Sequence, residues 1–121
     1  MSEPQPAGKG KPYDIRERTF EFGLAVIDVT PKLPDTPEAG VVRTQLARAG
    51  MSVGANVEEA DGAMTNPDRR RIFGIARREA REARFWLRAI DRKWSDRIDA
   101  KPLVQESTEL IYILSAIIDK L

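Results

Sequence analysis

The apolar residues of one long segment recur at alternating steps of three and four. They are Phe73, Ala76, Ala80, Ala83, Leu87, Ile90 and Trp94. This spacing puts one side chain per turn on a single narrow face of an α-helix, as in the seam of a helical bundle. Asn66 as N-cap and Pro67 in the first helical position mark a start, so we expect one helix from Asn66 to about Trp94. Such a helix must pack on other helices to bury its seam.

Three further segments show helical periodicity, and no segment shows the alternation of a strand. They are residues 14–30, 36–62 and 103–121. Asp14 and Glu17 have the spacing of a capping box, while Thr36 and Pro37 are typical of an N-cap and a first helical position. The sequence therefore predicts four helices in all.

The predicted fold is all-α, an antiparallel up-down-up-down four-helix bundle over residues 13–121. The connections between the segments are short, which makes consecutive helices antiparallel neighbours. In the second helix we expect the core stripe to run from Val42 to Met64. Residues 1–12 combine Pro, Gly, Ser and charged residues with almost no apolar ones. We expect them to form a flexible tail, because nothing offsets the entropy of ordering them.

The sequence contains no cysteine and no histidine. Their absence excludes disulfides, thiolate nucleophiles, imidazole bases and the zinc sites built on these ligands. The cluster Glu58, Glu59 and Asp61 is a weak candidate for an oxygen-only metal site, since di-metal bundles use Glu-x-x-His motifs. Ser52 has no base beside it to make it a nucleophile. We therefore predict no catalytic residues, no metal, no cofactor and no small-molecule substrate, in a protein that is not an enzyme.

No apolar run approaches the roughly 18 to 20 residues that span a bilayer. The first residues lack the apolar segment of a signal peptide. We expect a protein of a bacterial-type cytoplasm with no membrane partner.

The formal net charge of +1 conceals a strong division along the chain. Residues 66–97 hold eleven lysines and arginines against five acidic residues, a balance of +6, and the remainder is −5. Six arginines of the third helix fall within a sector of roughly 80° beside the core seam. This arginine stripe consists of Arg70, Arg77, Arg81, Arg84, Arg88 and Arg92. It is the strongest functional feature of the sequence.

Like charges four residues apart repel one another on a helix, so something should offset the stripe. One interpretation is a phosphate backbone of RNA or DNA, which arginine forks match well. The alternative is ion pairing within the chain or between subunits, in a scaffold that binds other proteins. The acids considered for such pairs are Glu58, Glu59, Asp61, Glu82, Asp91 and Asp96. Both interpretations remain open.

The first predicted helix is apolar on two opposed faces. One face holds Ile15, Phe22, Val26 and Val29, and the other holds Phe20, Leu24 and Ile27. The second face either lies deeper in the same bundle or contacts a neighbouring subunit. We predict that Phe20, Leu24 and Ile27 belong to an oligomer interface.

Two aromatic residues lie at the margins of the third helix's seam. Phe85 lies just beyond the arginine stripe, and Trp86 lies on the far side of the seam. Phe85 in an exposed position is suited to stacking on bases. Large aromatic side chains at the edge of a bundle more often belong to subunit contacts, so we place both in the oligomer interface.

Polar residues run beside the core stripe of the second helix. They are Gln45, Ser52, Asn56 and Glu59. They suit either a ligand site or a structural network, and we favour structural pairing.

Two segments resemble one known family. The stretch QLARAGMSVGANVEEA, residues 45–60, resembles a QLxRAxxSxxxNxxEG pattern, and IARREAREARFWLRAI, residues 75–90, resembles IAxxEAxExxYWLRxL. These patterns are found in small four-helix bundle proteins first noticed as products of intervening sequences in bacterial 23S ribosomal RNA genes. The residues that carry the resemblance are Gln45, Leu46, Arg48, Ala49, Ser52, Asn56, Glu59, Glu79, Ala80, Glu82, Trp86, Leu87 and Arg88. Here Ala60 replaces the usual glycine and Phe85 the usual tyrosine.

The resemblance implies an antiparallel bundle that assembles as a ring of five subunits and has no established enzymatic activity. It also implies a relation to the accessory protein of diversity-generating retroelements, a pentameric bundle that binds nucleic acid through a basic surface. A closed ring uses two different patches on every subunit, which suits a first helix with two apolar faces. The predicted function is therefore a homo-oligomer that binds RNA or DNA without strong sequence preference.

Overall fold

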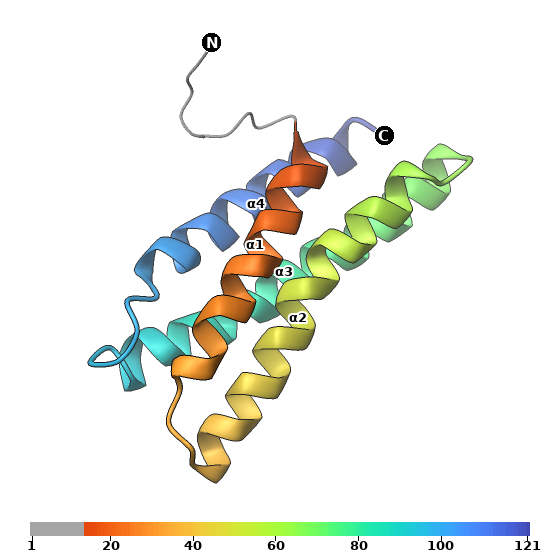
Figure 1. The fold of residues 1–121 in the computed structure, drawn as a ribbon. Coiled ribbons are helices and arrows are strands. Elements are labelled where there is room, and N and C mark those ends of the chain that lie inside the picture. Colours follow the sequence, from red (N-terminus) through yellow and green to blue (C-terminus); the bar gives the residue numbers. More distant parts are fainter. Residues whose placement is uncertain (1–13) are drawn as a thin grey trace.

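The computed structural model describes residues 14–121. Its helices are α1 (Ile15–Val29), the short 3-10 helix η1 (Thr30–Lys32), α2 (Pro37–Asp61), α3 (Asn66–Lys93) and α4 (Lys101–Asp119). Within the described residues there is no strand, and the four long helices form one bundle (Figure 1). The all-α fold and the four-helix bundle are confirmed. The predicted tail, residues 1–12, lies outside the described residues.

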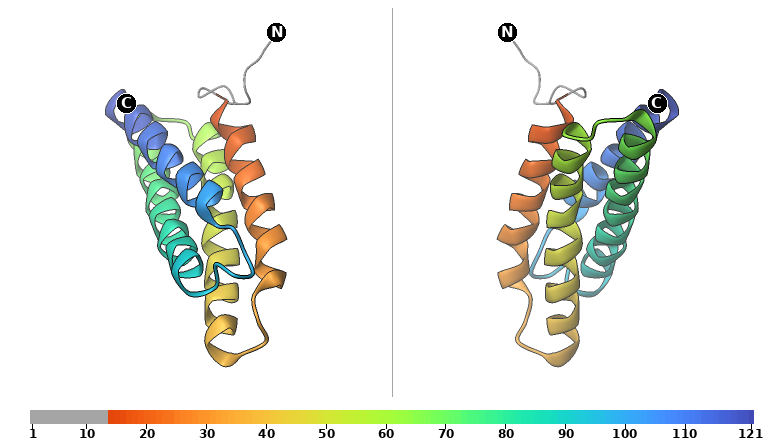
Figure 2. Two further views of the ribbon diagram at one scale, coloured as in Figure 1. Left: turned by 90° about the vertical axis from the view of Figure 1, so that its left-hand side faces the viewer. Right: turned by 90° about the vertical axis from the view of Figure 1, so that its right-hand side faces the viewer.

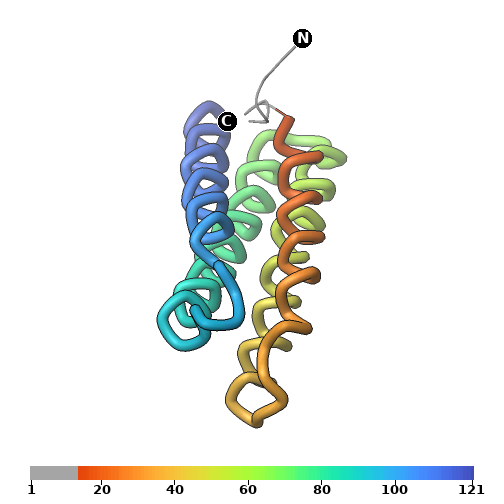
Figure 3. Tube along the Cα trace, turned by 60° about the vertical axis from the view of Figure 1, so that its left-hand side comes forward, coloured from red at the N-terminus to blue at the C-terminus, as the bar shows by residue number. Residues whose placement is uncertain are grey.

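Each long helix runs antiparallel to the next, so the start of α1 and the end of α4 lie at the same end of the bundle (Figure 1). The pairs α1–α2, α2–α3 and α3–α4 pack along their lengths, whereas α1 and α4 contact each other much less. Figures 2 and 3 show α1 and α4 as separate columns, with the connection before α4 looping toward α1. The bundle is therefore closed on three sides and loosely closed on the fourth.

A charged cluster bridges this fourth side. Arg18 on α1 donates from Nε and Nη2 to the two carboxylate oxygens of Glu106, at 2.7 and 2.8 Å, and from Nη2 to Glu109 at 2.6 Å. These hydrogen bonds, with that to Glu106 contributing most, raise the pKa of Arg18 despite its partial burial. The acidic residues of α4 near its middle thus face α1 and away from α3.

The seam predicted for α3 forms the centre of the core. Phe73, Ala76, Ala80, Ala83, Leu87 and Ile90 are all buried, and Trp94 is half-buried at the end of the helix. Opposite them lie Val26 of α1, Leu46 and Val53 of α2, and Leu110 of α4, which are completely inaccessible to solvent. The local spacing of three and four therefore correctly identifies the buried face.

Glycines let α1 and α2 approach closely. A Cβ atom added at Gly50 would lie 2.8 to 3.0 Å from side-chain atoms of Val26. One added at Gly54 would lie 3.2 to 3.3 Å from backbone atoms of Thr19 and Phe20. Because real Cβ atoms are essentially never found below 3.0 Å, Gly50 sets the distance between the two helices.

The start of α2 is as predicted, and the start of α3 differs by one residue. Thr36 caps α2, its Oγ1 accepting from the backbone N–H of Ala39 at 3.2 Å. The cap of α3 is Thr65 rather than Asn66, since Thr65 has the extended backbone of an N-cap and its Oγ1 accepts from the N–H of Asp68 at 3.2 Å. Asn66 is instead the first residue of the helix.

Two other details of the prediction are wrong. Asp14 precedes α1 but makes no side-chain cap, because its φ of −91° and ψ of 62° do not have the extended conformation that aims the side chain at the first N–H groups. The capping box of Asp14 and Glu17 is therefore not formed. Met64, expected in the core stripe of α2, is 90% exposed because the helix ends at Asp61.

Candidate nucleic-acid interface

The arginine stripe lies on the side of α3 that faces α4. Arg77 donates from Nη1 to the hydroxyl of Ser115 at 3.1 Å, and Arg84 donates from Nη1 to the hydroxyl of Thr108 at 3.4 Å. Both acceptors are on α4, so the two arginines mark where the helices meet. Because α3 and α4 are antiparallel, the stripe follows this line along the bundle.

The six guanidinium groups of the stripe have no acidic partner in the part of the chain that the structure describes. Arg77 and Arg84 are half-buried, with hydroxyl partners, and the other four are exposed. A neutral hydroxyl orients a guanidinium group but does not neutralise it. The stripe therefore carries uncompensated positive charge on the surface of the subunit.

Most of the acids considered as partners of the stripe are bound to other cations. The pairs are Glu82 with Arg48, Asp91 with Lys101 at 2.8 Å, and Arg16 with Glu58 at 3.9 Å and with Asp61 at 2.7 Å. Glu59 and Asp96 form no ion pair within residues 14–121. The interpretation that the stripe is neutralised by acids of its own chain is therefore wrong for the described residues.

An exposed tyrosine lies beside the stripe, and the sequence analysis missed it. Tyr112 is 70% exposed on α4. It follows Thr108 by four residues and precedes Ser115 by three, the spacings that share one face of a helix. Since Thr108 and Ser115 accept from α3 arginines, that face borders the stripe. The sequence did contain a signal for this tyrosine: it is an aromatic residue on the polar face of α4 that Thr108 and Ser115 mark.

Phe85 and Trp86 contact one another but differ in burial. Their rings lie edge to face with centroids 5.0 Å apart. Phe85 is exposed in the single chain, whereas Trp86 is half-buried, packs against the core and donates from Nε1 to Glu82 at 3.1 Å. Trp86 thus has a structural role within the subunit, and only Phe85 presents a largely free ring.

The second apolar face of α1 is exposed in the single chain. Phe20, Leu24 and Ile27 are 59%, 40% and 38% exposed, while Phe22 and Val26 on the opposite face are buried. The interpretation that this face lies deeper in the same bundle is wrong. It follows that α1 presents an apolar surface with no partner among residues 14–121.

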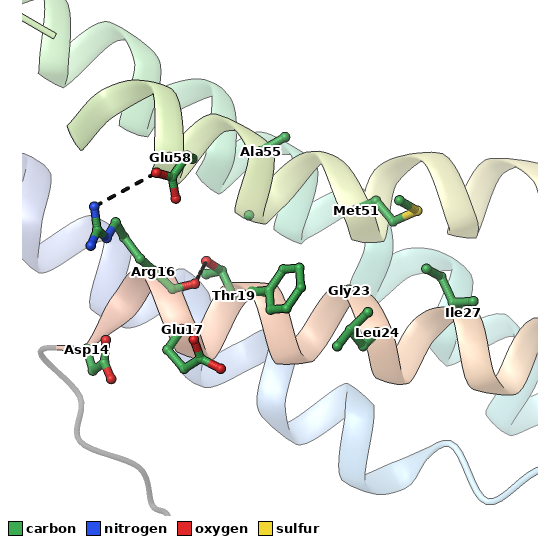
Figure 4. A pocket seen from close by; sticks show the side chains of 12 residues that line it. Asp14, Arg16, Glu17, Thr19, Gly23, Leu24, Ile27, Met51, Ala55 and Glu58 are labelled. Atoms are coloured by element: carbon green, nitrogen blue, oxygen red, sulfur yellow. Dashed lines mark hydrogen bonds and ion pairs between the residues drawn. The ribbon is translucent and has the colours of Figure 1, made fainter. Parts of the chain in front are cut away.

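This surface is one side of a groove of about 620 Å³ between α1 and α2. Figure 4 shows Leu24 and Ile27 from α1 beside Met51 from α2, with Arg16 and Glu58 at the charged end. Gly23 forms part of the floor. Met51, half exposed, was not singled out from the sequence because its position on α2 lies outside the core stripe.

Residues 14–121 contain neither a cluster of metal ligands nor a helix suited to a membrane. No group of three or more acidic side chains is arranged to hold a metal ion, including the cluster around Glu58, Glu59 and Asp61. None of the described helices combines the length and the apolar character needed to cross a membrane.

Comparison with known proteins identifies the family. The family model for the 23S rRNA-intervening sequence protein matches residues 11–116. The chain belongs to this family. A crystal structure of a protein of unknown function from the S23 ribosomal protein family of Bacteroides thetaiotaomicron superposes with a TM-score of 0.77 at 28% identity, covering 86% of this chain and 97% of the other. No curated protein matches the chain, and neither description names an enzymatic activity.

Five of the residues that carry the resemblance to the 23S rRNA-intervening sequence proteins form one polar cluster between α2 and α3, namely Gln45, Arg48, Glu79, Glu82 and Trp86. Arg48 donates to Glu79 at 3.1 Å and to Glu82, and the amide oxygen of Gln45 lies 3.4 Å from Arg48 Nε and Nη2. Trp86 donates to the same Glu82. The hydrogen bond from Arg48, followed by that from Trp86, lowers the pKa of Glu82, and the contact with Glu82 raises the pKa of Arg48. The motif residues of this family member therefore join two helices.

The polar flank of α2 is also largely structural. Gln45 contacts Arg48, and Asn56 donates from Nδ2 to the backbone oxygen of Ser52 at 2.8 Å. Glu59 is exposed and forms no ion pair within the described residues. Structural pairing, favoured from the sequence, is confirmed for Gln45 and Asn56.

Proposed function

We propose that this member of the 23S rRNA-intervening sequence protein family is a non-enzymatic homo-oligomer that binds RNA or DNA through the arginine stripe. The ring of five subunits and the relation to the accessory protein of diversity-generating retroelements, both implied by the sequence resemblance, are part of this proposal. The observation that carries it is the set of six arginines on one face of α3 with no acidic partner in residues 14–121.

The chemistry of these groups supports phosphate as the partner. A guanidinium group offers five N–H donors in a fixed fork, and two parallel hydrogen bonds match the oxygens of a phosphate. Arg77 and Arg84 each use one Nη atom on a hydroxyl of α4, which holds the fork in place and leaves its other donors available. A phosphate backbone would also offset the repulsion among arginines spaced four residues apart.

The assembly part of the proposal rests on the apolar groove between α1 and α2. Phe20, Leu24, Ile27 and Met51 expose apolar surface on one side of the subunit. Contiguous apolar surface of this kind marks an interaction site in soluble proteins. Phe85 is a further exposed aromatic residue, on α3 and outside the groove, and it is the candidate for the second contact that a cyclic assembly requires.

The test is a titration of the purified protein against fluorescent RNA and DNA oligonucleotides at increasing salt. If about four phosphates are neutralised per duplex DNA site, log K should fall with log salt at a slope of about −3.6. Replacing Arg77, Arg81, Arg84 and Arg88 together by glutamine should remove most of the binding and bring the slope toward zero. A matched control replaces Lys32, Arg71, Arg97 and Lys120 by glutamine, four exposed cations outside the stripe and the groove, and should retain most of the affinity at physiological salt.

Absence of binding at low salt would refute the proposal, as would equal loss of affinity in the two quadruple variants. The competing function, a scaffold with ion pairs between subunits, predicts a different outcome. In that case the stripe variant loses thermal stability or dissociates, and the wild-type protein binds no nucleic acid.

A further inference from the structure

One aromatic ring lies exposed on the surface of α4. Tyr112 is 70% exposed, and no hydrogen bond, ion pair or ring contact joins it to another residue in the described range 14–121. Its hydroxyl and most of its ring surface are therefore available to a ligand. Isolated exposed aromatic residues are common on protein surfaces, so it is the surroundings of Tyr112 that distinguish it.

The two hydrogen bonds between α3 and α4 define the surroundings of Tyr112. Arg84 reaches Thr108 and Arg77 reaches Ser115, so residues 77 and 115 lie at one level of the bundle and residues 84 and 108 at another. The two levels are ~10.5 Å apart, at 1.5 Å per residue. Halfway between them in sequence lie Arg81 on α3 and Tyr112 on α4.

The ring of Tyr112 therefore borders the middle of the stripe, at the same level as the exposed Arg81. Nearby acids of the described chain bind other cations: Glu106 and Glu109 of α4 accept from Arg18 on α1, and Asp91 accepts from Lys101. Asp119 lies farther along α4, near its end. An exposed ring thus lies beside a row of guanidinium groups that have no acidic partner in the described chain.

This combination fits a single strand better than a duplex. Proteins that bind single strands without sequence preference combine a positive track for the backbone with aromatic side chains on which bases stack. In a duplex, the faces of the bases are stacked on one another, so a surface tyrosine gains nothing from them. Cationic side chains alone would serve both kinds of nucleic acid equally, and it is the ring that discriminates.

We propose that the surface formed by Arg77, Arg81, Arg84, Arg88 and Tyr112 binds single-stranded nucleic acid, with an unpaired base stacked on Tyr112 and the flanking phosphates bound by the arginines. This inference rests on the proposed function and adds the kind of nucleic acid to it. Stacking uses the face of the ring, so the hydroxyl of Tyr112 is dispensable.

The test is fluorescence anisotropy of the full chain with three labelled ligands of equal length: a 15-nucleotide oligouridine RNA, the corresponding oligothymidine DNA and a 15-base-pair DNA duplex. Tyr112→Ala should weaken binding of the single strands about 5- to 150-fold, the equivalent of one lost stacking contact. Binding of the duplex should change less than about twofold. Tyr112→Phe should bind the single strands within about twofold of the wild-type protein, and the melting temperature of both variants should stay unchanged because the side chain is exposed.

The outcomes separate this inference from the function on which it rests. If the stripe variant loses binding while Tyr112→Ala binds every ligand as the wild type does, the arginine interface stands and the single-strand inference is refuted. Equal weakening of single strands and duplex by Tyr112→Ala also refutes it. If no ligand binds the wild-type protein at low salt, both proposals fail.

Discussion

The close approach of α1 and α2 leads to a prediction about two glycines. Gly50→Ala places a methyl carbon 2.8 to 3.0 Å from Cβ, Cγ1 and Cγ2 of Val26. Val26 is completely buried, and a β-branched side chain in a helix has one strongly preferred rotamer, so it has little freedom to move away. Gly74→Ala is the matched control, because a Cβ at that position meets nothing within 4 Å and both glycines lie inside long helices.

The magnitude follows from two opposed effects. Replacing glycine by alanine inside a helix stabilises it by about 1 kcal/mol, which is the whole effect expected for Gly74→Ala. Overpacking a well-packed core costs about 1 to 3 kcal/mol. The net effect of Gly50→Ala is then a loss of about 0 to 2 kcal/mol. The two variants should differ by about 1 to 3 kcal/mol, which isolates the contact with Val26.

The assay is thermal unfolding followed by far-ultraviolet circular dichroism at one fixed protein concentration, because self-association would make the melting temperature depend on concentration. For a domain of this size, 1 kcal/mol corresponds to roughly 4 °C, so the melting temperatures of the two variants should differ by about 4 to 12 °C. In a Val26→Ala background two of the three close atoms are gone, and Gly50→Ala should become stabilising. The reasoning is refuted if Gly50→Ala stabilises the wild-type protein as much as Gly74→Ala does.

Two further predictions concern assembly and pH. Leu24→Glu places a charge in the α1–α2 groove and should reduce the mass measured by light scattering to that of a monomer. The control Met64→Glu, at a site 90% exposed between α2 and α3, should leave the mass unchanged. Equal masses for the two variants contradict the proposed interface. Because Arg48 and Trp86 lower the pKa of Glu82 in the folded protein, this carboxylate stabilises the fold above its unfolded pKa, and the stabilisation is lost as the pH falls through the folded value. The melting temperature of Glu82→Gln should therefore fall less than that of the wild type between about pH 5 and pH 3, and identical acid profiles would exclude this contribution.

The fold follows from patterns that are local in sequence, which is why it was predictable. The steps of three and four in α3 depend only on helix geometry, and Phe73 through Ile90 are buried as that geometry requires. Errors arose where local signals compete. Thr65 and Asn66 are both good N-cap residues, and only the extended backbone at Thr65 decides between them.

The arginine stripe was predictable for the same reason, but its partners were not. Glu82 could pair with an arginine of the stripe or with Arg48 of α2, and the outcome depends on which helix packs beside Glu82. In the structure α2 packs there, and Glu82 pairs with Arg48. The position of Tyr112 at the level of Arg81 depends likewise on how far α4 is displaced along α3. A helical wheel shows neither the partner of Glu82 nor the level of Tyr112, because both depend on how two helices are aligned with each other.

The order of the helices around the bundle connects the two proposals. Because α1 neighbours α2 and α4, and α3 neighbours the same two, the outer faces of the α1–α2 and α3–α4 pairs lie on opposite sides of the bundle (Figure 2). Self-association through the α1–α2 groove would therefore leave the arginines between α3 and α4 exposed. Each added subunit then contributes another copy of the same weak site to one strand, and linked sites bind far more tightly than one alone. On this argument, affinity for nucleic acid depends on the apolar residues Phe20, Leu24 and Ile27 as much as on the arginines, although the two sets lie on opposite surfaces.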